Sequence, residues 1–149
     1  MQNQYYRLLF HAVWATRMQQ SLIGDTLRPE LHKYLCHKVG EYGGTIMAAG
    51  GMDDHVHMVF SIPPHLALAP FIGRLKGSSS HWINHFQIPE SGFSWQGGYG
   101  VLSIANDDLD RICNYVREQA SHHANGTILP LYEDTIHKAD GRLKHCRYT

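Results

Sequence analysis

Hydrophobic and polar positions alternate most regularly between residues 54 and 62, which read DHVHMVFSI. Side chains of a strand point alternately to its two faces, so this pattern predicts a strand. The next residues, Pro63 and Pro64, would end it. One face would carry Val56, Met58, Phe60 and Ile62, and the other His55, His57, Val59 and Ser61.

The rest of the chain divides into segments with helical spacing of apolar residues and segments with the composition of strands. Apolar residues recur at helical spacing over 25–42, 70–86 and 106–123, with Asn106 or Asp107 as the expected cap of the last helix. Segments 5–14, 45–52 and 99–105 have strand character. The order βαββαβ plus one helix predicts a ferredoxin-like α+β fold, with a four-stranded antiparallel sheet and an added C-terminal helix. We expect one domain over 1–125 and an irregular basic tail over 126–149.

Composition narrows the class of protein. The 149 residues are 43% hydrophobic and 17% charged, which favours a packed core over disorder. No apolar run approaches the roughly 18 residues of a membrane span, and the N-terminus lacks signal-peptide features. Three cysteines without a CxxC spacing indicate free thiols. We therefore expect a soluble cytoplasmic protein. A net charge of zero counts mildly against non-specific coating of nucleic acid.

His55 and His57 form the first candidate site. They would lie on the same face of the strand, roughly 6 to 7 Å apart along it, where neutral imidazoles can share a metal ion. The chain has 12 histidines, so about one such pair is expected by chance. The pair alone therefore leaves both a metal site and ordinary core packing open.

Tyr115, Gln119 and His122 form the second candidate group, on one face of the predicted last helix. A tyrosine beside an apolar stripe usually fills the core, and a glutamine one turn later is usually solvated. If this helix packs over the histidine face, however, the phenol becomes a nucleophile and the amide oxygen a third metal ligand.

Four motifs, in this order, resemble one known family. They are DHVHMVF at 54–60, LKGSSS at 75–80, WQGGYGVLSIA at 95–105 and YVREQ at 115–119. Together they are similar to the small single-tyrosine transposases of the HUH endonuclease superfamily, of the insertion-sequence 200/605 type. The resemblance implies the ferredoxin-like fold and a DNA transposase acting on single-stranded DNA with subterminal hairpins. It also implies a homodimer, in which the catalytic helix can act on the partner's site, and no nucleotide cofactor.

The resemblance also implies roles for individual residues. Tyr115 would attack phosphorus to give a 5′-phosphotyrosine, and His55, His57 and Gln119 would bind a divalent metal. The absence of a thiolate favours Mg²⁺ or Mn²⁺ over zinc. A base must take the phenol proton, and His122 and Lys76 are both candidates. Asp54 would orient the histidines or simply form the turn before them. Candidate DNA contacts are Arg7, Arg17, Arg74, Arg117, Trp95 and Tyr99, although the aromatic residues are equally typical of a core.

Three alternatives remain open at the level of the sequence. A domesticated or palindrome-associated HUH nickase would share the chemistry without an element to move. A non-enzymatic ferredoxin-like module would bind metal or nucleic acid and form no covalent adduct. A histidine phosphoesterase would activate water and leave Tyr115 unmodified.

Overall fold

A four-stranded antiparallel sheet organises the chain. The computed structural model describes residues 4–133. The strands are β1 (Leu9–Ala15), β2 (Thr45–Gly51), β3 (His55–Ser61) and β4 (Gly100–Ser103). They lie in the order β2-β3-β1-β4, and each neighbouring pair is antiparallel. This is the strand order that βαββαβ connectivity produces, so the predicted α+β fold class is confirmed.

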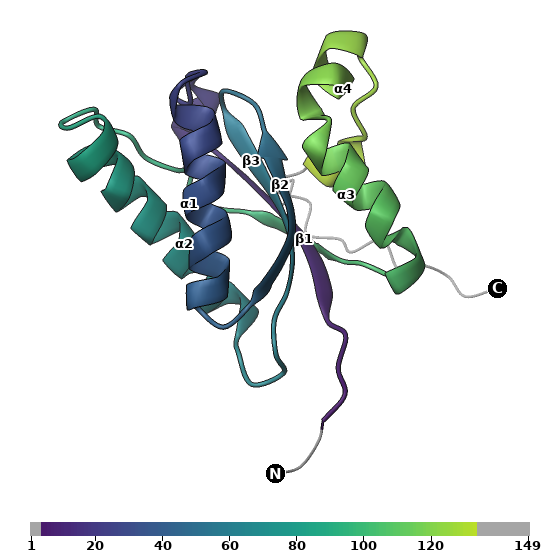
Figure 1. Ribbon diagram of the computed structural model, residues 1–149. Coiled ribbons are helices and arrows are strands. Elements are labelled where there is room, and N and C mark those ends of the chain that lie inside the picture. Colours follow the sequence, from purple (N-terminus) through teal and green to yellow (C-terminus); the bar gives the residue numbers. More distant parts are fainter. Residues whose placement is uncertain (1–3, 134–149) are drawn as a thin grey trace.

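Helices cover both faces of this sheet (Figure 1). On one face lie α1 (Leu27–Glu41) and α2 (Leu68–Trp82), and on the other lie α3 (Leu109–Arg117), α4 (Gln119–Asn125) and the short α5 (Pro130–Glu133). Single turns at Arg17–Gln19, Ile83–Gln87 and Asn106–Asp108 complete the regular elements of the described residues. Each face of the sheet therefore has its own core.

The two faces of β3 divide as the alternation predicts. Val56, Met58, Phe60 and Ile62 belong to the core under α1 and α2. Val59 belongs to the second core, together with Tyr115 and Val116 of α3. Because helices cover both faces, β3 is buried from His55 to Phe60, and the histidine face is enclosed rather than exposed to solvent.

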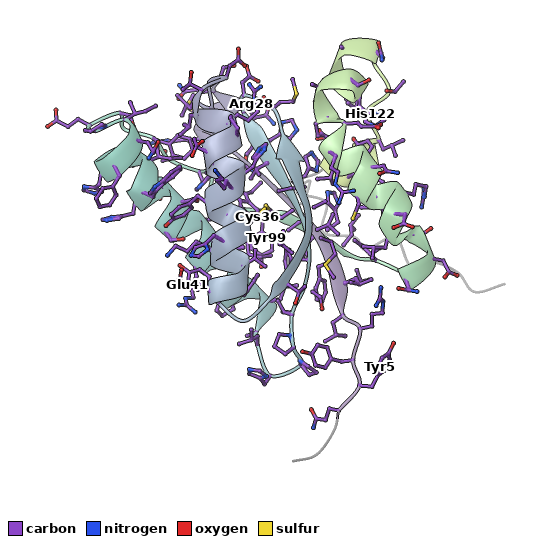
Figure 2. The ribbon with its side chains drawn as sticks, viewed as in Figure 1. Tyr5, Arg28, Cys36, Glu41, Tyr99 and His122 are labelled. Carbon is purple, nitrogen blue, oxygen red and sulfur yellow. The ribbon has the colours of Figure 1, made fainter. Side chains whose placement is uncertain are left out.

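Several predicted boundaries are wrong. The first strand starts at Leu9 rather than at residue 5, and Tyr5 is 91% exposed and projects from the body (Figure 2). The second helix starts at Leu68 rather than at residue 70 and ends as a regular α-helix at Trp82, before one wider turn. The strand expected over 99–105 is only Gly100–Ser103.

The predicted last helix is interrupted. Glu118, with φ −100° and ψ 28°, separates α3 from α4. The N-cap residue of α3 is Asp108, which makes no side-chain capping hydrogen bond, so the expected cap at Asn106 or Asp107 is also wrong. Gly126 ends α4 in the left-handed region (φ 66°), as glycine does at many helix ends.

Of the expected tail, 126–149, the structure describes residues up to Glu133, including α5. The basic residues of this tail lie outside the described residues, as does Cys146; they are Lys138, Arg142, Lys144 and Arg147. Cys36 and Cys113 carry free thiols, as expected. Over residues 4–133, the structure contains no helix of the length and apolarity that a membrane span requires.

Candidate active site

The two histidines of β3 lie under α3 and α4. His55 and His57 are only 7% and 0% exposed, and their ring centroids are 5.0 Å apart. The backbone of β3 pairs with β1 and β2 on its two sides, which holds both imidazoles on a rigid support. The strand therefore presents two fixed nitrogen donors to the space below the helices.

The nucleophile candidate reaches this space from α3. Tyr115 is 5% exposed, and its ring lies edge-on to that of His57, with 6.1 Å between the centroids. Gln119, 1% exposed, places its Oε1 3.2 Å from Nε2 of His55. The same amide donates from Nε2 to the backbone carbonyl of Tyr115 at 3.3 Å, which turns its oxygen toward the histidines. The structure thus brings Tyr115, Gln119 and both histidines together within one chain.

Glu133 of α5 also enters the cluster, and the sequence reasoning missed it. One carboxylate oxygen, Oε2, lies 3.2 Å from Nε2 of His57 and 3.4 Å from Nε2 of His55. The other oxygen, Oε1, accepts a hydrogen bond from the Tyr115 hydroxyl at 2.5 Å. A single carboxylate therefore links the imidazole pair to the phenol.

Each imidazole of the pair has a partner at its second nitrogen. Nδ1 of His55 lies 2.6 Å from the Asp54 carboxylate, so it donates its proton there. Nδ1 of His57 lies 2.8 Å from Nε2 of His11, a residue of β1 that is 1% exposed and stacks on the His57 ring. These contacts aim both Nε2 atoms at the cluster, which is how outer partners commonly orient metal-binding histidines. Asp54 therefore lies where the sequence prediction placed an orienting residue.

Burial and hydrogen bonds shift the pKa values of the cluster. Burial lowers the pKa of His57, which outweighs the opposite effect of Glu133. For His55, burial acts in the same direction, but hydrogen bonds to Asp54 and Gln119 prevail, and the pKa rises. Burial opposes ionisation of Glu133, yet hydrogen bonds from His57 and Tyr115 lower its pKa to about 2. Burial first, and then the bond to Glu133, raise the pKa of Tyr115 to about 12.

The donor set fits a divalent metal ion. The Nε2 atoms of His55 and His57 and one carboxylate oxygen of Glu133 all lie within 4.8 Å of one another. Ligands about 2.1 Å from an ion are about 3.0 to 3.4 Å apart, close to the separations found here. In the neutral His55 ring, which keeps its proton on Nδ1 for Asp54, Nε2 carries the lone pair that a metal ion requires. Several lone pairs therefore converge on a space that favours a cation.

The two candidate bases lie in different places. His122 packs beside Tyr115, with ring centroids 4.7 Å apart, and Figure 2 shows it on α4, across the sheet from Cys36 of α1. Its nitrogens face Thr127 and Glu118 rather than the phenol. Lys76 is on α2, on the opposite face of the sheet, where its ammonium donates to two backbone carbonyls of residues 96 and 98. The structure does not bring Lys76 to the cluster within this chain.

The predicted DNA contacts do not gather on one face. Arg74 is on α2, where its guanidinium lies 3.8 Å from the Tyr42 ring centroid, whereas Arg117 is on α3 and donates to the Met47 carbonyl. Arg7 and Arg17 are exposed near the two ends of β1. Trp95 and Tyr99 pack against the core under α1 and α2. This agrees with the alternative given above, that these aromatic residues are part of the core. Their roles in DNA binding remain predictions.

An opening leads to the cluster. A cavity of about 240 Å³ lies beside it, lined by His55 and Glu133 and also by Asp53, Asp54 and His123. Nε2 of His123 is 3.1 Å from the Gln119 oxygen, so this histidine belongs to the rim of the site. The cavity gives ions and small groups a path to the ligand atoms.

The sequence analysis missed two residues of the cluster, His11 and Glu133, and only His11 could have been predicted from a sequence pattern. His11 occupies the same face of the sheet as His57, because β1 pairs with β3 in a register that aligns His11 with Val59. A register guess for the first and third strands would have found it. Glu133 follows a chain reversal after Gly126, and no local pattern in the sequence indicates where that segment goes.

Comparison with known proteins places the chain among relatives of one kind. Residues 4–119 match the family described as "Transposase IS200 like". The ISDra2 transposase TnpA of Deinococcus radiodurans is 24% identical over 119 residues, which cover 76% of this chain and 85% of the relative. The transposase for insertion sequence element IS200 of Salmonella typhimurium is 26% identical over 129 residues, which are 82% of this chain and 83% of the relative.

Solved structures agree with this result. A crystal structure of a putative transposase from Deinococcus radiodurans has a TM-score of 0.62 at 25% identity, covering 78% of this chain and 93% of that one. A REP-associated tyrosine transposase bound to a REP hairpin has a TM-score of 0.61 at 16% identity, covering 83% and 73%. The second likeness concerns the fold alone.

Proposed function

Because this chain belongs to the family of IS200-like transposases, we propose that it cleaves and rejoins single-stranded DNA through a covalent bond to Tyr115. The observation that carries the proposal is the convergence of a phenol and two imidazoles on the Glu133 carboxylate, with the Gln119 amide oxygen against one of these imidazoles. The histidines and the Tyr115 helix are about 60 residues apart in the sequence. Phosphoryl transfer to tyrosine requires a nucleophilic phenol and a site that binds a cation, and these groups supply both.

In the proposed reaction, the Tyr115 oxygen attacks the phosphorus of a DNA phosphodiester. An oxygen–phosphorus bond to tyrosine forms, the bond to the 3′ oxygen breaks, and that oxygen takes a proton from water, so the products are a 5′-phosphotyrosine and a free 3′-OH. The phenol proton passes to a base. Of the two predicted bases, His122 rather than Lys76 lies beside Tyr115, and its ring must turn from Thr127 and Glu118 to accept the proton. A 3′-OH of another strand then attacks the phosphotyrosine and restores a phosphodiester. Because the covalent bond retains the energy of the original linkage, rejoining requires no ATP.

His55, His57 and Gln119 are the proposed ligands of Mg²⁺ or Mn²⁺, and the Glu133 carboxylate lies beside the two imidazoles. When bound, such an ion supplies positive charge that polarises a phosphate oxygen and stabilises charge developing in the transition state. Asp54 and His11 hold the two imidazoles with Nε2 turned toward the ion.

Single-stranded DNA with subterminal hairpins is the proposed substrate. One structural neighbour was solved bound to a REP hairpin, and that ligand of a different protein motivates the choice of probe for this chain. A homodimer and a cytoplasmic location complete the proposal. Tyr115 and Gln119 meet the histidines of their own chain in this structure, and the same helices of a dimer partner are the other arrangement that the family resemblance implies.

The decisive experiment is incubation with hairpin-bearing single-stranded DNA and Mn²⁺, followed by a denaturing gel and peptide mapping. We expect a protein band whose shift survives denaturation and maps to Tyr115. Tyr115→Phe should abolish this adduct and retain DNA binding, and Tyr42→Phe, at the C-cap of α1, is the matched control that should keep it. DNA binding without an adduct would support a binding module instead, and cleavage without an adduct would support activation of water.

A further inference from the structure

The Glu133 carboxylate makes contacts on both sides of the cluster that the proposed reaction assigns to DNA. One oxygen lies between the Nε2 atoms of His55 and His57, and the other accepts from the Tyr115 hydroxyl. A phosphodiester in the reaction needs the same two contacts, with one oxygen toward the ion and the phosphorus facing the phenol. Both groups are monoanions with oxygens about 2 to 2.5 Å apart, so one can replace the other.

The space at the phenol does not accommodate both anions. Attack requires the phosphorus to come within about 3 to 3.5 Å of the phenol oxygen. Oε1 of Glu133 already lies 2.5 Å from that oxygen. The backbone N–H of Leu129 also donates to it, at 3.1 Å. Both contacts come from the segment that follows α4, so the nucleophile is engaged by this segment in two directions.

The carboxylate is held in place by the cluster itself. Glu133 is only 18% exposed, and its polar neighbours are His55, His57, His123 and Tyr115. The connection from α4 to α5 runs through Gly126 in the left-handed region and Thr127, which bonds back to His122. Among the described residues, release of Glu133 therefore involves movement of the four-residue helix α5 and of its short connection to α4.

We propose that Glu133 occupies the place of the scissile phosphate in the DNA-free protein, where it ligates the metal ion and holds the Tyr115 hydroxyl until DNA displaces it. The inference rests on the proposed function of the same site. Glu133 and the DNA phosphate cannot occupy the site together. Removal of the carboxylate therefore lowers the affinity for the metal ion and raises the affinity for DNA. Without Glu133, the ion loses an anionic ligand, whereas DNA loses a competitor.

The first test measures Mn²⁺ binding without DNA, by the electron paramagnetic resonance signal of the free ion. Glu133→Gln should weaken Mn²⁺ binding at least tenfold. Glu118→Gln is the matched control, because Glu118 is 65% exposed, faces His122 rather than the cluster, and carries the same charge. An unchanged Mn²⁺ affinity in Glu133→Gln would overturn the proposal.

The second test measures binding of fluorescent single-stranded DNA in a Tyr115→Phe background with Mn²⁺, where no covalent bond can form. Adding Glu133→Gln should tighten DNA binding at least fivefold more than adding Glu118→Gln, which corrects for the loss of one negative charge. Glu133→Asp keeps the charge but retracts the carboxylate, and it should also tighten binding. Equal effects of the two glutamine variants, or weaker binding in Glu133→Gln, would contradict the proposal.

The two tests separate this inference from the function on which it rests. Failure of Tyr115 to form an adduct overturns the proposed function, whereas the affinities for Mn²⁺ and DNA are measured without catalysis. Circular dichroism and thermal unfolding of each variant show whether the fold is retained. Glu133→Asp provides a second variant if Glu133→Gln fails to fold.

Discussion

Gly50 of β2 lies directly against the backbone carbonyl of Val116 on α3. A Cβ atom at residue 50 would overlap the carbonyl oxygen of Val116 and lie 2.8 Å from its carbonyl carbon. Only glycine allows this approach, and Val116 immediately follows Tyr115 in the chain. The close approach of α3 to the sheet therefore depends on the lack of a side chain at Gly50. The same approach sets the distance of the Tyr115 phenol from the histidines.

Gly50→Ala should displace α3. Because the clash is with backbone, no rotamer change relieves it, and we expect a loss of about 1–3 kcal/mol in the free energy of unfolding, as for overpacked cores. Urea denaturation measures this loss. Gly73→Ala on α2 is the control, since a Cβ there meets nothing within 4 Å, and alanine in a helix is favoured over glycine by about 1 kcal/mol. Equal stability of the two variants would show that α3 does not depend on Gly50.

His11→Phe should weaken metal binding. The phenyl ring retains the stacking on His57 but loses the 2.8 Å hydrogen bond that orients it. Loss of such orienting partners typically costs about 10–100-fold in metal affinity. Titration with Mn²⁺ measures the change. His32→Phe removes an imidazole from α1, on the other face of the sheet, and should leave the affinity as it is. A normal affinity in His11→Phe would exclude the orienting role.

Divalent metal should stabilise the folded chain. An ion that binds the native state alone raises the free energy of unfolding by about 2.7 kcal/mol at 100 times its dissociation constant. Thermal unfolding should therefore shift upward with Mn²⁺ concentration and return to its starting value after chelation. The double variant His55→Ala, His57→Ala removes two of the nitrogen donors, and its unfolding temperature should not respond to Mn²⁺. A response that survives this change would place the ion elsewhere.

His32 should make the protein less stable in acid. Burial lowers its pKa from 6.5 to about 4, and its buried Nε2 has no hydrogen-bond partner among residues 4–133. The unfolded chain therefore binds the proton more readily, so stability is lost as the pH falls from 6.5 toward 4. At pH 5, this amounts to about 2 kcal/mol.

His32→Leu should remove that part of the pH dependence, measured by urea denaturation at pH 7 and pH 5. His37→Leu on the same helix is the control, because His37 is 78% exposed and sits beside Glu41. Parallel losses of stability in the wild type and His32→Leu would show that other groups control the acid response.

The fold was predictable because its signals are local and repeat along the chain. The alternation around His55 and His57 separates the two faces of β3 as predicted. That helices bury the histidine face as well is a property of the fold that the alternation alone does not imply. The ends of elements were harder to place, because they depend on neighbours. Tyr5 looks like a strand residue, yet β1 pairs only from Leu9, where β3 offers a partner.

The site was predictable only in part, for a related reason. Tyr115 and Gln119 were found because helical spacing places them on one face, and the packing of α3 on the sheet then brings them to His55. His11 required knowledge of strand pairing, and Glu133 required the path of a chain that turns back after α4. Contacts that depend on a loop's direction leave no periodic trace in the sequence.

The interruption at Glu118 places the Tyr115 phenol and the Gln119 amide on two separate helices, α3 and α4. In an unbroken helix, adding one residue between Tyr115 and Gln119 would swing one of them about 100° around the axis. Here α3 is anchored through Val116, while α4 follows a joint of a single non-helical residue. A substitution at Glu118 would therefore change the direction of α4 and its amide more than that of α3, whose backbone is held against β2 at Gly50.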